Sequence, residues 1–426
     1  MRNKLLTLSL LVVLSFTLTA CTLQDLPLVG KFFGGGGGTN EPVTLTVWGL
    51  WENRDVMNGL IAKYQEAHPN VTINYDDRSI LNLRDYKERV STASSLDADM
   101  VLVHNTWVHR LEENLTPMPS GLMTVDAYKS TFYPVAADSG IANGNIYAVP
   151  FYYDGLVLLY NKNHFDEVGQ QAAPTAWEEF RVLALKLTIR TGQGDTSGLV
   201  RAGAAIGNAN NIEHFTDILG LMFAQTDVEV PNDIDSKPAA DAVDFYTTFV
   251  KEDKVWDDSM PEAVTAFAQE KVSMIFVPTW RILEVIEANP TLDFGVAPVP
   301  QALPDSPVSY ASFWMYVVPS SSKNSNVAWD FINFLSQDEQ ELALFEAGSK
   351  IRSFGVPYAR ASLGAEIQSH EVLGPLVSVA PYAKSSEIAA RSGNDKAVDS
   401  VKAAINKILG GADTTLTLTE LKEGKL

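Results

Sequence analysis

The chain has 426 residues, and its hydrophobic share of 46% and charged share of 20% are ordinary for a globular protein. Acidic side chains outnumber basic ones, and the formal net charge of −20 argues against binding to nucleic acid or to anionic lipid. Cys21 is the only cysteine, which excludes an intramolecular disulfide framework and a cysteine-based metal cluster.

The N-terminal segment has the pattern of a secretory signal. Arg2 and Lys4 precede an apolar run over 5–20, which is too short to span a bilayer comfortably, so we expect 1–20 to be a cleaved signal peptide. Small residues followed by Cys21 resemble a bacterial lipobox, which implies that this cysteine is lipidated and begins the mature protein. Lipid chains would then hold the protein on a membrane without a transmembrane helix. The alternative is an ordinary signal peptide with a chance cysteine at its end.

A glycine-rich stretch separates this segment from the rest of the chain. Five consecutive glycines at 34–38 have no strand-to-helix context and no following Gly-Lys-Ser/Thr, so they indicate a flexible tether rather than a phosphate loop. We therefore expect 21–42 to be the lipidated cysteine and a tether. The remaining ~385 residues are too many for one core and suit two or three domains.

Strands and helices alternate after the tether. Apolar periodicity predicts strands and intervening helices in β-α-β-α-β order, with strands at 43–48, 71–75 and 100–103 and helices at about 56–64 and 83–95. This order implies a parallel, helix-covered sheet, whose ligand crevices lie at the carboxyl ends of its strands. We therefore expect 48–54 and 104–107 at the functional edge.

The rest of the chain continues in the same mixed pattern, without an internal repeat. Further strands are predicted at 144–150, 151–161, 272–277, 294–299 and 313–318. Further helices are predicted from 174, at 212–224, 239–253 and 261–270, from 280, and at 326–335, 338–347 and 395–409. The Gly- and Asn-rich stretch 191–211 is expected to form loops around a short strand.

Five short signatures then occur in order along the chain. They are GNIYAVP at 144–150, LYNKNHF at 159–165, PTAWEEF at 174–180, AFAQEKVSM at 266–274, and 317–332 with its AWDFI. Each is weak alone, but their order resembles the family 1 extracellular solute-binding proteins, the group that contains maltose- and oligosaccharide-binding receptors. Two positions depart from the family pattern, because Glu270 replaces a usual glycine and Leu159 a usual tyrosine.

The resemblance implies an α/β, two-lobed periplasmic-binding-protein fold of type II. Each lobe would be a mostly parallel sheet flanked by helices, and hinge strands would join the lobes. The lobes would hold residues 43–152 with 293–318 and residues 155–290 with 321–410, followed by a C-terminal tail over 411–426. A ligand would lie in the cleft between lobes that close on it.

Aromatic residues at expected strand ends and cleft-facing turns are candidate ligand contacts. Sugars present flat apolar faces and a rim of hydroxyls, so a site needs aromatic platforms with planar polar groups at the edge. The candidates are Trp51, Trp107, Tyr152, Trp280 and Trp314. A place in the core is the alternative for each.

Four polar residues complete the candidate site. Arg54 follows the first strand and Asn105 the third, while Arg352 follows a glycine turn. Asp154 follows the Pro150 turn, where the resemblance implies a ligand-contacting acid or amide. Solvated surface positions, or a helix start at Arg54, are the alternatives.

The sequence contains poor constellations for catalysis, and we expect no metal or cofactor. His104 and His109 lack a metal-binding spacing, and no Gly-x-Ser-x-Gly elbow is present. A glycosidase with paired carboxylates stays open, because such pairs assemble in space without a local motif.

The sequence thus predicts an extracytoplasmic, lipid-anchored substrate-binding protein of an ABC importer. Its expected partners are a small solute, most naturally a sugar or oligosaccharide, and the transmembrane permease subunits; the protein itself is expected to be a monomer on the membrane's extracytoplasmic face. A polyamine or other cationic solute is the alternative ligand, since aromatic walls with an acid also suit an amine. A lipid-anchored carbohydrate-active enzyme is the alternative from another class.

Overall fold

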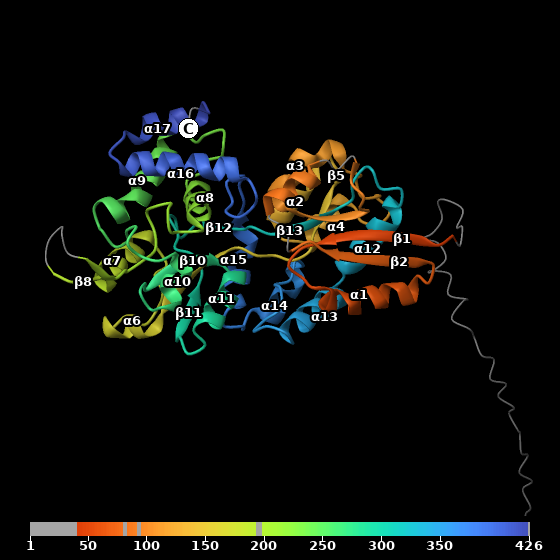
Figure 1. Ribbon diagram of the computed structural model, residues 1–426, viewed down its shortest axis with the longest axis horizontal. Coiled ribbons are helices and arrows are strands. Elements are labelled where there is room, and N and C mark those ends of the chain that lie inside the picture. The colour runs from red at the N-terminus through yellow and green to blue at the C-terminus, as the bar shows by residue number, and fades with distance from the viewer. Residues whose placement is uncertain (1–40, 80–82, 92–94, 193–197, 425–426) are drawn as a thin grey trace, which may run out of the picture. The chain divides into compact units, whose positions relative to one another are not determined.

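The computed structural model describes residues 41–79, 83–91, 95–192 and 198–424 (Figure 1). The predicted signal peptide, the lipidation candidate Cys21 and the glycine run lie outside these residues. Residues 42–426 form one unit by their contacts, and the fold described below is that of this unit.

The first sheet has five strands in the order β2-β1-β3-β13-β6. Its members are β2 (Val71–Asp77), β1 (Val43–Gly49), β3 (Met100–His104), β13 (Trp314–Val317) and β6 (Ala148–Pro150). β1 pairs in parallel with β2 and β3, as the β-α-β pattern predicts, whereas β13 runs antiparallel to both β3 and β6. Every residue of β3 is buried, which explains why its sequence is a continuous apolar run.

The first helix shows how sequence places an element on this sheet. Asn53 accepts a hydrogen bond from the Val56 backbone N–H at 3.0 Å and caps the N-terminus of α1 (Arg54–Ala67). Val56, Leu60 and Tyr64 are buried at helical spacing, and α1 packs against β2. The chain therefore leaves β1 at its carboxyl end and turns at once into the helix.

The second sheet has three strands in the order β10-β7-β11. Its members are β10 (Met274–Pro278), β7 (Leu156–Asn161) and β11 (Phe294–Ala297), and both neighbours run antiparallel to β7. The expected α/β two-lobed class holds, but the expectation of a mostly parallel sheet fails for these three strands. The expected placement of 293–318 in the first lobe is also wrong for β11, which pairs with β7. β7 follows β6 along the chain and leads from the first sheet into the second, whereas β10 and β11 run in the opposite direction to β7. A parallel bridge between Ala202 and Val272 continues the pairing beyond β10.

The remaining elements surround these two sheets. The other strands form short pairs, namely β4 (Ile141–Ala142) with β5 (Asn145–Ile146), β8 (Ile189–Arg190) with β9 (Leu199–Arg201), and β12 (Ser309–Tyr310) with β14 (Ala383–Lys384). The other helices up to the second sheet are α2 (Leu83–Val90), α3 (Val108–Leu111), α4 (Val125–Thr131), α5 (Pro134–Gly140), α6 (Lys162–Glu167), α7 (Trp177–Leu187), α8 (Phe215–Gln225), α9 (Lys237–Lys251), α10 (Ala263–Ala268) and α11 (Trp280–Ala288). After the second sheet come α12 (Ser325–Leu335), α13 (Asp338–Ser349), α14 (Gly364–Ile367), α15 (Leu373–Val379), α16 (Asp395–Leu409) and α17 (Thr414–Lys422). Single 3-10 turns occupy Asn105–Trp107, Glu112–Asn114, Ala361–Leu363 and Ala380–Tyr382.

Helices α12 and α13 lie with the first sheet, which corrects the expected placement of 321–410 as a whole in the second lobe. Both helices pack against α1 (Figure 1). The Tyr64 hydroxyl donates to Asp330 Oδ2 at 2.7 Å, and Trp329 Nε1 donates to the Thr116 carbonyl at 3.1 Å. The apolar faces of these helices are therefore buried directly after β13 ends, before the chain returns to the second sheet.

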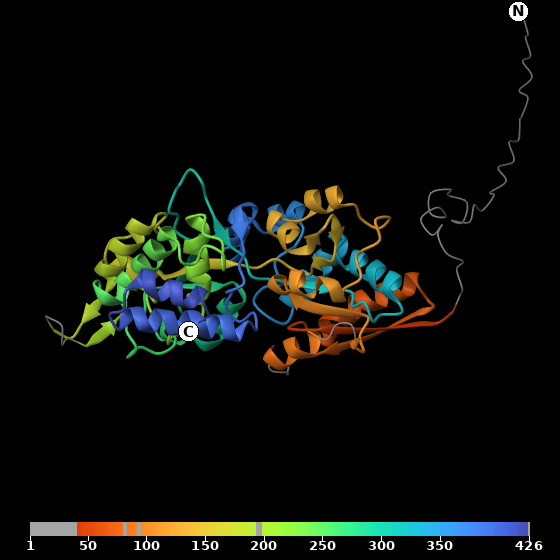
Figure 2. The same cartoon turned by 90° about the horizontal axis from the view of Figure 1, so that it is seen from above.

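The C-terminal segment is a helix rather than the expected tail. Asp413 accepts from the Leu416 backbone N–H at 2.8 Å and caps α17, while Leu418 is buried. Helix α17 packs against α9 and α16, and the blue C-terminal helices lie beside the green α8 and α9 region in both views (Figures 1 and 2). The run of threonines weakened the apolar periodicity that would have predicted this helix.

Two chain segments cross side by side between the sheets. The predicted strand 151–161 begins only at 156, because 151–155 forms one of these crossings and 311–313 forms the other. The Phe151 N–H donates to the Trp314 carbonyl at 3.0 Å, and the Ser312 N–H donates to the Asp154 carbonyl at 3.0 Å. A Cβ on Gly155 would lie 2.5 Å from the Tyr310 carbonyl oxygen, so only glycine fits where the crossings touch.

Candidate functional site

Three tryptophans and a histidine meet around Trp314, the first residue of β13. The Trp314 ring centroid lies 5.4 Å from that of Trp107, 5.4 Å from that of His104 and 5.9 Å from that of Trp51. All three contacts are edge-to-face, the geometry that aromatic rings prefer. The structure thus brings together Trp51, Trp107 and Trp314, three of the residues that the sequence predicts as ligand contacts.

The three tryptophans differ in exposure. Trp51 is 45% exposed, whereas Trp314 is 7% and Trp107 only 2% exposed. Trp107 Nε1 donates to the Ser392 carbonyl at 2.7 Å, so its polar atom is already used inside the protein. Trp107 therefore packs against Trp314 as a buried side chain, whereas the sequence predicted an aromatic surface open to a ligand.

Glu52 and Arg352 form an ion pair next to Trp51. Arg352 Nη2 donates to Glu52 Oε1 at 2.6 Å, and Arg352 Nε donates to the Phe354 carbonyl at 3.1 Å. Glu52 is 1% exposed, and its second oxygen, Oε2, has no partner among the described residues. Burial raises the pKa of Glu52 from its usual value, while the Arg352 hydrogen bond and charge oppose that rise. The pair therefore satisfies only one of the two carboxylate oxygens of Glu52.

Tyr152 and Asp154 lie on the crossing segment. Burial, and next the nearby charges of Asp154 and Glu52, raise the pKa of Tyr152 well above its usual value. Asp154 Oδ1 accepts from the backbone N–H of Gly155 at 2.7 Å and from the N–H and hydroxyl of Thr279 at 3.0 and 2.9 Å. Burial raises the Asp154 pKa to about 6, and these hydrogen bonds oppose the rise. Asp154 thus anchors the start of α11, and only Oδ2, with its long 3.4 Å bond from the Trp280 N–H, has capacity left.

Trp280 opens α11 and is 38% exposed. Two guanidinium groups lie over its ring, with Arg281 Cζ at 5.1 Å and Arg391 Cζ at 5.2 Å from the centroid. The His214 ring meets Trp280 edge-on at 6.1 Å between centroids. Trp280 is therefore the second exposed aromatic surface that the sequence predicted, now with polar groups around it.

Buried polar atoms beside Trp280 lack protein partners. His214 Nδ1 lies 2.7 Å from Asp217 Oδ2, and this contact orients the ring, whereas Nε2 is buried without a partner among the described residues. Glu213 pairs with Arg281 through Oε1, and its buried Oε2 is likewise unpartnered in that part of the chain. Buried polar atoms are nearly always hydrogen-bonded in proteins, so these atoms call for a partner that the described part of the chain does not supply, such as a water, an ion or a ligand.

Sequence reasoning missed Glu213, His214 and Arg391. The first two follow the Gly- and Asn-rich stretch 191–211, which signals loops but gives no sign of which side chain faces a site. Arg391 lies just before α16 with a φ of 54°. The fold alone brings these three residues to Trp280.

Arg54 and Asn105 do not join the aromatic residues as predicted. Arg54 Nη2 donates to the Tyr75 carbonyl at 2.6 Å, because the first turn of α1 directs it to β2. Asn105 is buried, and its amide donates to Ser139 and Ser385 Oγ at 3.2 and 2.9 Å while its oxygen accepts from the Phe313 N–H. Asn105 therefore ties chain segments together and has little capacity for a ligand.

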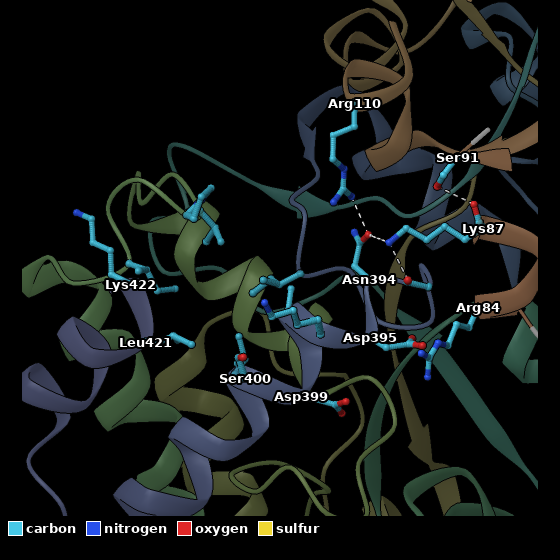
Figure 3. A pocket seen from close by; sticks show the side chains of 18 of the residues that line it. Arg84, Lys87, Ser91, Arg110, Asn394, Asp395, Asp399, Ser400, Leu421 and Lys422 are labelled. Atoms are coloured by element: carbon cyan, nitrogen blue, oxygen red, sulfur yellow. Dashed lines mark hydrogen bonds between the residues drawn. The ribbon is translucent and has the colours of Figure 1, made fainter. Parts of the chain in front are cut away.

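A hollow of about 880 Å³ lies beyond Trp107, between α2 and α16 (Figure 3). Lys87 and Arg110 converge there on Asn394, and Arg110 Nη2 donates to Asn394 Oδ1 at 2.7 Å. Lys87 Nζ also donates to the Gly393 carbonyl at 2.7 Å. A Cβ on Gly393 would lie 3.4 Å from Trp107 Cζ2, so the hollow adjoins the aromatic cluster through this contact.

The described residue ranges offer neither a metal site nor a membrane-spanning helix. No group of three His, Cys, Asp or Glu side chains is arranged there to hold a metal ion. Burial lowers the pKa of His104 to about 3, so this histidine is neutral and serves as a hydrogen-bond partner of Ser312. Within the same ranges, none of the helices combines the length and hydropathy needed to span a bilayer.

Comparison with known proteins identifies the family of this chain. Residues 51–342 match the model of the bacterial extracellular solute-binding proteins, which covers more than half of the chain. The chain belongs to this family. Its matched region contains Trp51, Trp280 and Trp314, while Arg352 and Arg391 lie beyond it.

Relatives and solved structures of this family agree in fold. The diacetylchitobiose-binding protein of Streptomyces coelicolor is 24% identical over 340 residues, covering 76% of this chain and 75% of that protein. The sugar-binding protein MalE of Xanthomonas citri superposes with a TM-score of 0.71 at 17% identity, covering 89% of this chain and 96% of that one. A cyclo/maltodextrin-binding protein in complex with maltotetraose also gives 0.71, at 15% identity and 92% and 98% coverage. The chain thus has the two-lobed fold of periplasmic sugar-binding proteins.

Proposed function

We propose that this protein is the carbohydrate-binding receptor of an ABC-type importer, which captures a sugar or oligosaccharide between its two lobes and delivers it to the permease. The observation that carries the proposal is the pairing of exposed aromatic rings with buried, unpartnered polar atoms. Trp51 has Glu52 Oε2 beside it in sequence, and Trp280 has Glu213 Oε2 and His214 Nε2 near it.

Each group has a role in sugar binding. The Trp51 and Trp280 rings stack on the apolar faces of pyranose rings, because C–H groups of the sugar contact the negative face of the indole. Carboxylate oxygens of Glu52 and Glu213 accept from sugar hydroxyls, and His214 Nε2 accepts as well when Nδ1 carries the proton toward Asp217. The guanidinium of Arg391 offers donors at the edge of Trp280.

The charges support a neutral or acidic ligand over a polyamine. The carboxylates of the site already have partners within the protein: Glu52 pairs with Arg352, Glu213 with Arg281, and Asp154 with backbone N–H groups. Arg281 and Arg391 lie close to the Trp280 ring, and their positive charges disfavour a cationic ligand there. The relative named for diacetylchitobiose and the similar structure solved with maltotetraose support a sugar in preference to a polyamine.

We propose binding and release without chemistry. The first lobe holds the five-stranded sheet with α12 and α13, and the second holds the three-stranded sheet with α15, α16 and α17. The crossings at 151–155 and 311–313 act as the hinge. Ligand contacts made by both lobes supply the differential affinity that favours the closed state.

The N-terminal segment fits delivery at a membrane surface. Cys21 is proposed as the lipidated first residue of the mature protein, and the glycine run as a tether to the globule. The receptor then works as a monomer on the extracytoplasmic face, close to the transmembrane subunits of its importer.

Thermal unfolding of residues 42–426 against neutral sugars, oligosaccharides and spermidine tests the proposal. A ligand at a hundred times its Kd adds about 2.7 kcal/mol and should raise Tm by roughly 2–4 °C. The shift should disappear in Trp280→Ala but persist in Tyr382→Ala, a matched removal of an aromatic ring that is 49% exposed. A shift with spermidine alone would favour the cationic alternative, and sugar turnover during the assay would favour the enzyme.

A further inference from the structure

Basic side chains outnumber acidic ones around the hollow beyond Trp107, in contrast to the chain as a whole. Five basic and three acidic side chains line it, although the whole chain has 32 basic and 52 acidic residues. The basic ones are Arg84, Lys87, Arg110, Lys396 and Lys422. Its volume of about 880 Å³ lies within the range of small-molecule sites in proteins.

Two of these cations converge on one neutral oxygen. Lys87 Nζ and Arg110 Nη2 both donate to Asn394 Oδ1, as the dashed lines in Figure 3 mark. The carboxylate nearest to Arg110 is that of Glu387, at 3.9 Å. Burial, and then the charge of Arg110, lower the pKa of Lys87 from its usual value. Two like charges held together cost free energy, and a bound anion would offset that cost.

A further basic residue, Arg391, lies at the start of the loop 391–394, whose other end contacts Lys87 and Arg110. Arg391 lies three residues before Asn394, is exposed, and makes no ion pair within the described part of the chain, where its guanidinium lies over Trp280. The loop 391–394 therefore lies between Arg391, at the proposed sugar platform, and the cations Lys87 and Arg110, at the hollow. The rest of the hollow is closed by apolar side chains such as Val230, Ile234 and Val401.

We propose that the hollow binds the acidic unit of an oligosaccharide, so that the ligand class of this receptor is an oligosaccharide containing uronic acid. The inference rests on the proposed function and narrows its substrate. The uronate carboxylate accepts charge-assisted hydrogen bonds from Lys87 and Arg110, which are about twice as strong as neutral ones.

Calorimetry with a matched pair of ligands tests this assignment. The probes are trimeric oligouronides of galacturonate, glucuronate and mannuronate, each compared with its methyl ester, which keeps the ring and removes the charge. At least one acid should bind about tenfold or more tightly than its ester, and the ratio should fall as salt rises. Equal affinity of acid and ester throughout the panel would overturn the proposal.

Variants distinguish recognition of charge from support of the loop. The double change Lys87→Gln and Arg110→Gln should reduce the acid-to-ester ratio to within about threefold, because both cations are removed. Asn394→Ala removes the shared acceptor without changing charge and should keep the ratio, even if both affinities fall. The double change Lys129→Gln and Lys251→Gln, at exposed positions on α4 and α9, controls for the loss of two positive charges. A ratio that survives the double change would contradict the assignment.

The failure of this inference is distinct from the failure of the proposed function. Tight binding of a neutral oligosaccharide, with no advantage for any acid, would overturn the acidic ligand and leave the sugar receptor intact. Absence of binding by acid, ester and neutral sugars alike would overturn both.

Discussion

Trp51 lies edge-on against Trp314, with ring centroids 5.9 Å apart and ring planes at 69°. Trp51 holds this position with a φ of 70°, a left-handed backbone conformation that a bulky residue rarely adopts. Strain of this kind costs about 1–3 kcal/mol and persists where the surrounding structure imposes it, often at binding sites. The backbone strain and the exposed ring together make Trp51 the first candidate for mutation in a test of ligand binding.

The change Trp51→Gly separates ligand binding from stability. Glycine relieves about 1–2 kcal/mol of backbone strain, while loss of the ring contact costs about 0.5–1.5 kcal/mol. We therefore expect the free energy of unfolding to stay within about 1 kcal/mol of the wild type, and sugar affinity to fall tenfold or more. Denaturant unfolding and calorimetry measure the two quantities. Unchanged affinity would show that Trp51 is not part of the site. Trp314 is only 7% exposed, so Trp314→Ala should by contrast lower the free energy of unfolding by about 3–5 kcal/mol.

The pair of Glu52 and Arg352 predicts a pH-dependent loss of stability. Arg352→Leu leaves a buried carboxylate unpaired, which costs about 3–5 kcal/mol at pH 7. Burial already raises the Glu52 pKa above its usual 4.5, and loss of Arg352 raises it further. The loss should therefore shrink as pH falls toward 4, where Glu52 is protonated in both the folded and the unfolded state.

A second substitution checks this explanation. Adding Glu52→Gln to Arg352→Leu removes the charge and should recover much of the stability at pH 7. Denaturant unfolding of the single and double variants at pH 4 and 7 measures the free energy of interaction between Glu52 and Arg352. A double variant as unstable as the single one would show that Arg352 stabilises the fold through packing instead.

Asp154 should make stability decline with rising pH. Its pKa of about 6 in the folded protein exceeds the usual 3.8, so the unfolded state loses its proton first. The stability due to this shift is full below pH 3.8 and is lost as pH rises through 6, by roughly 3 kcal/mol in all. We expect wild type to lose about 2 kcal/mol of this relative to Asp154→Asn between pH 4 and 7. Parallel pH profiles for the two proteins would contradict the shifted pKa.

The crossing at Gly155 can be tested with paired glycine changes. Gly155→Ala places a Cβ 2.5 Å from the Tyr310 carbonyl oxygen and should cost about 1–3 kcal/mol. Gly59→Ala, in the exposed middle of α1 with nothing within 4 Å of its Cβ, should instead gain about 0.5–1 kcal/mol. Thermal unfolding of both variants measures the contrast. A tolerated Gly155→Ala would mean that the two crossings do not need their close contact.

The sequence predicts the first sheet well because its signals are local. Alternation at Val43–Gly49, helical spacing from Val56 to Tyr64 and the apolar run at β3 each determine one element. The placement of α12 and α13 depends on tertiary partners such as Asp330 with Tyr64, which no local pattern contains. For the same reason α17 was expected to be a tail.

The candidate site divides in the same way. Trp51, Trp280 and Trp314 could be predicted because aromatic residues at strand ends are conspicuous in the sequence. Trp107 and Asn105 share that position, but their polar atoms are used by Ser392 and by Ser139 and Ser385. Glu213 and His214 could not be predicted, because a free Nε2 or Oε2 appears only once every neighbour is in place.

The most direct test of the central claim is a calorimetric titration of residues 42–426 with the carbohydrate that raises Tm most. We expect binding of one ligand per chain, a negative heat-capacity change from burial of the sugar faces, and loss of binding when Trp51→Gly and Trp280→Ala are combined. Binding that survives this double change would place the ligand elsewhere on the protein. Absence of heat with every carbohydrate, at concentrations that give a signal with another solute class, would contradict the sugar receptor itself.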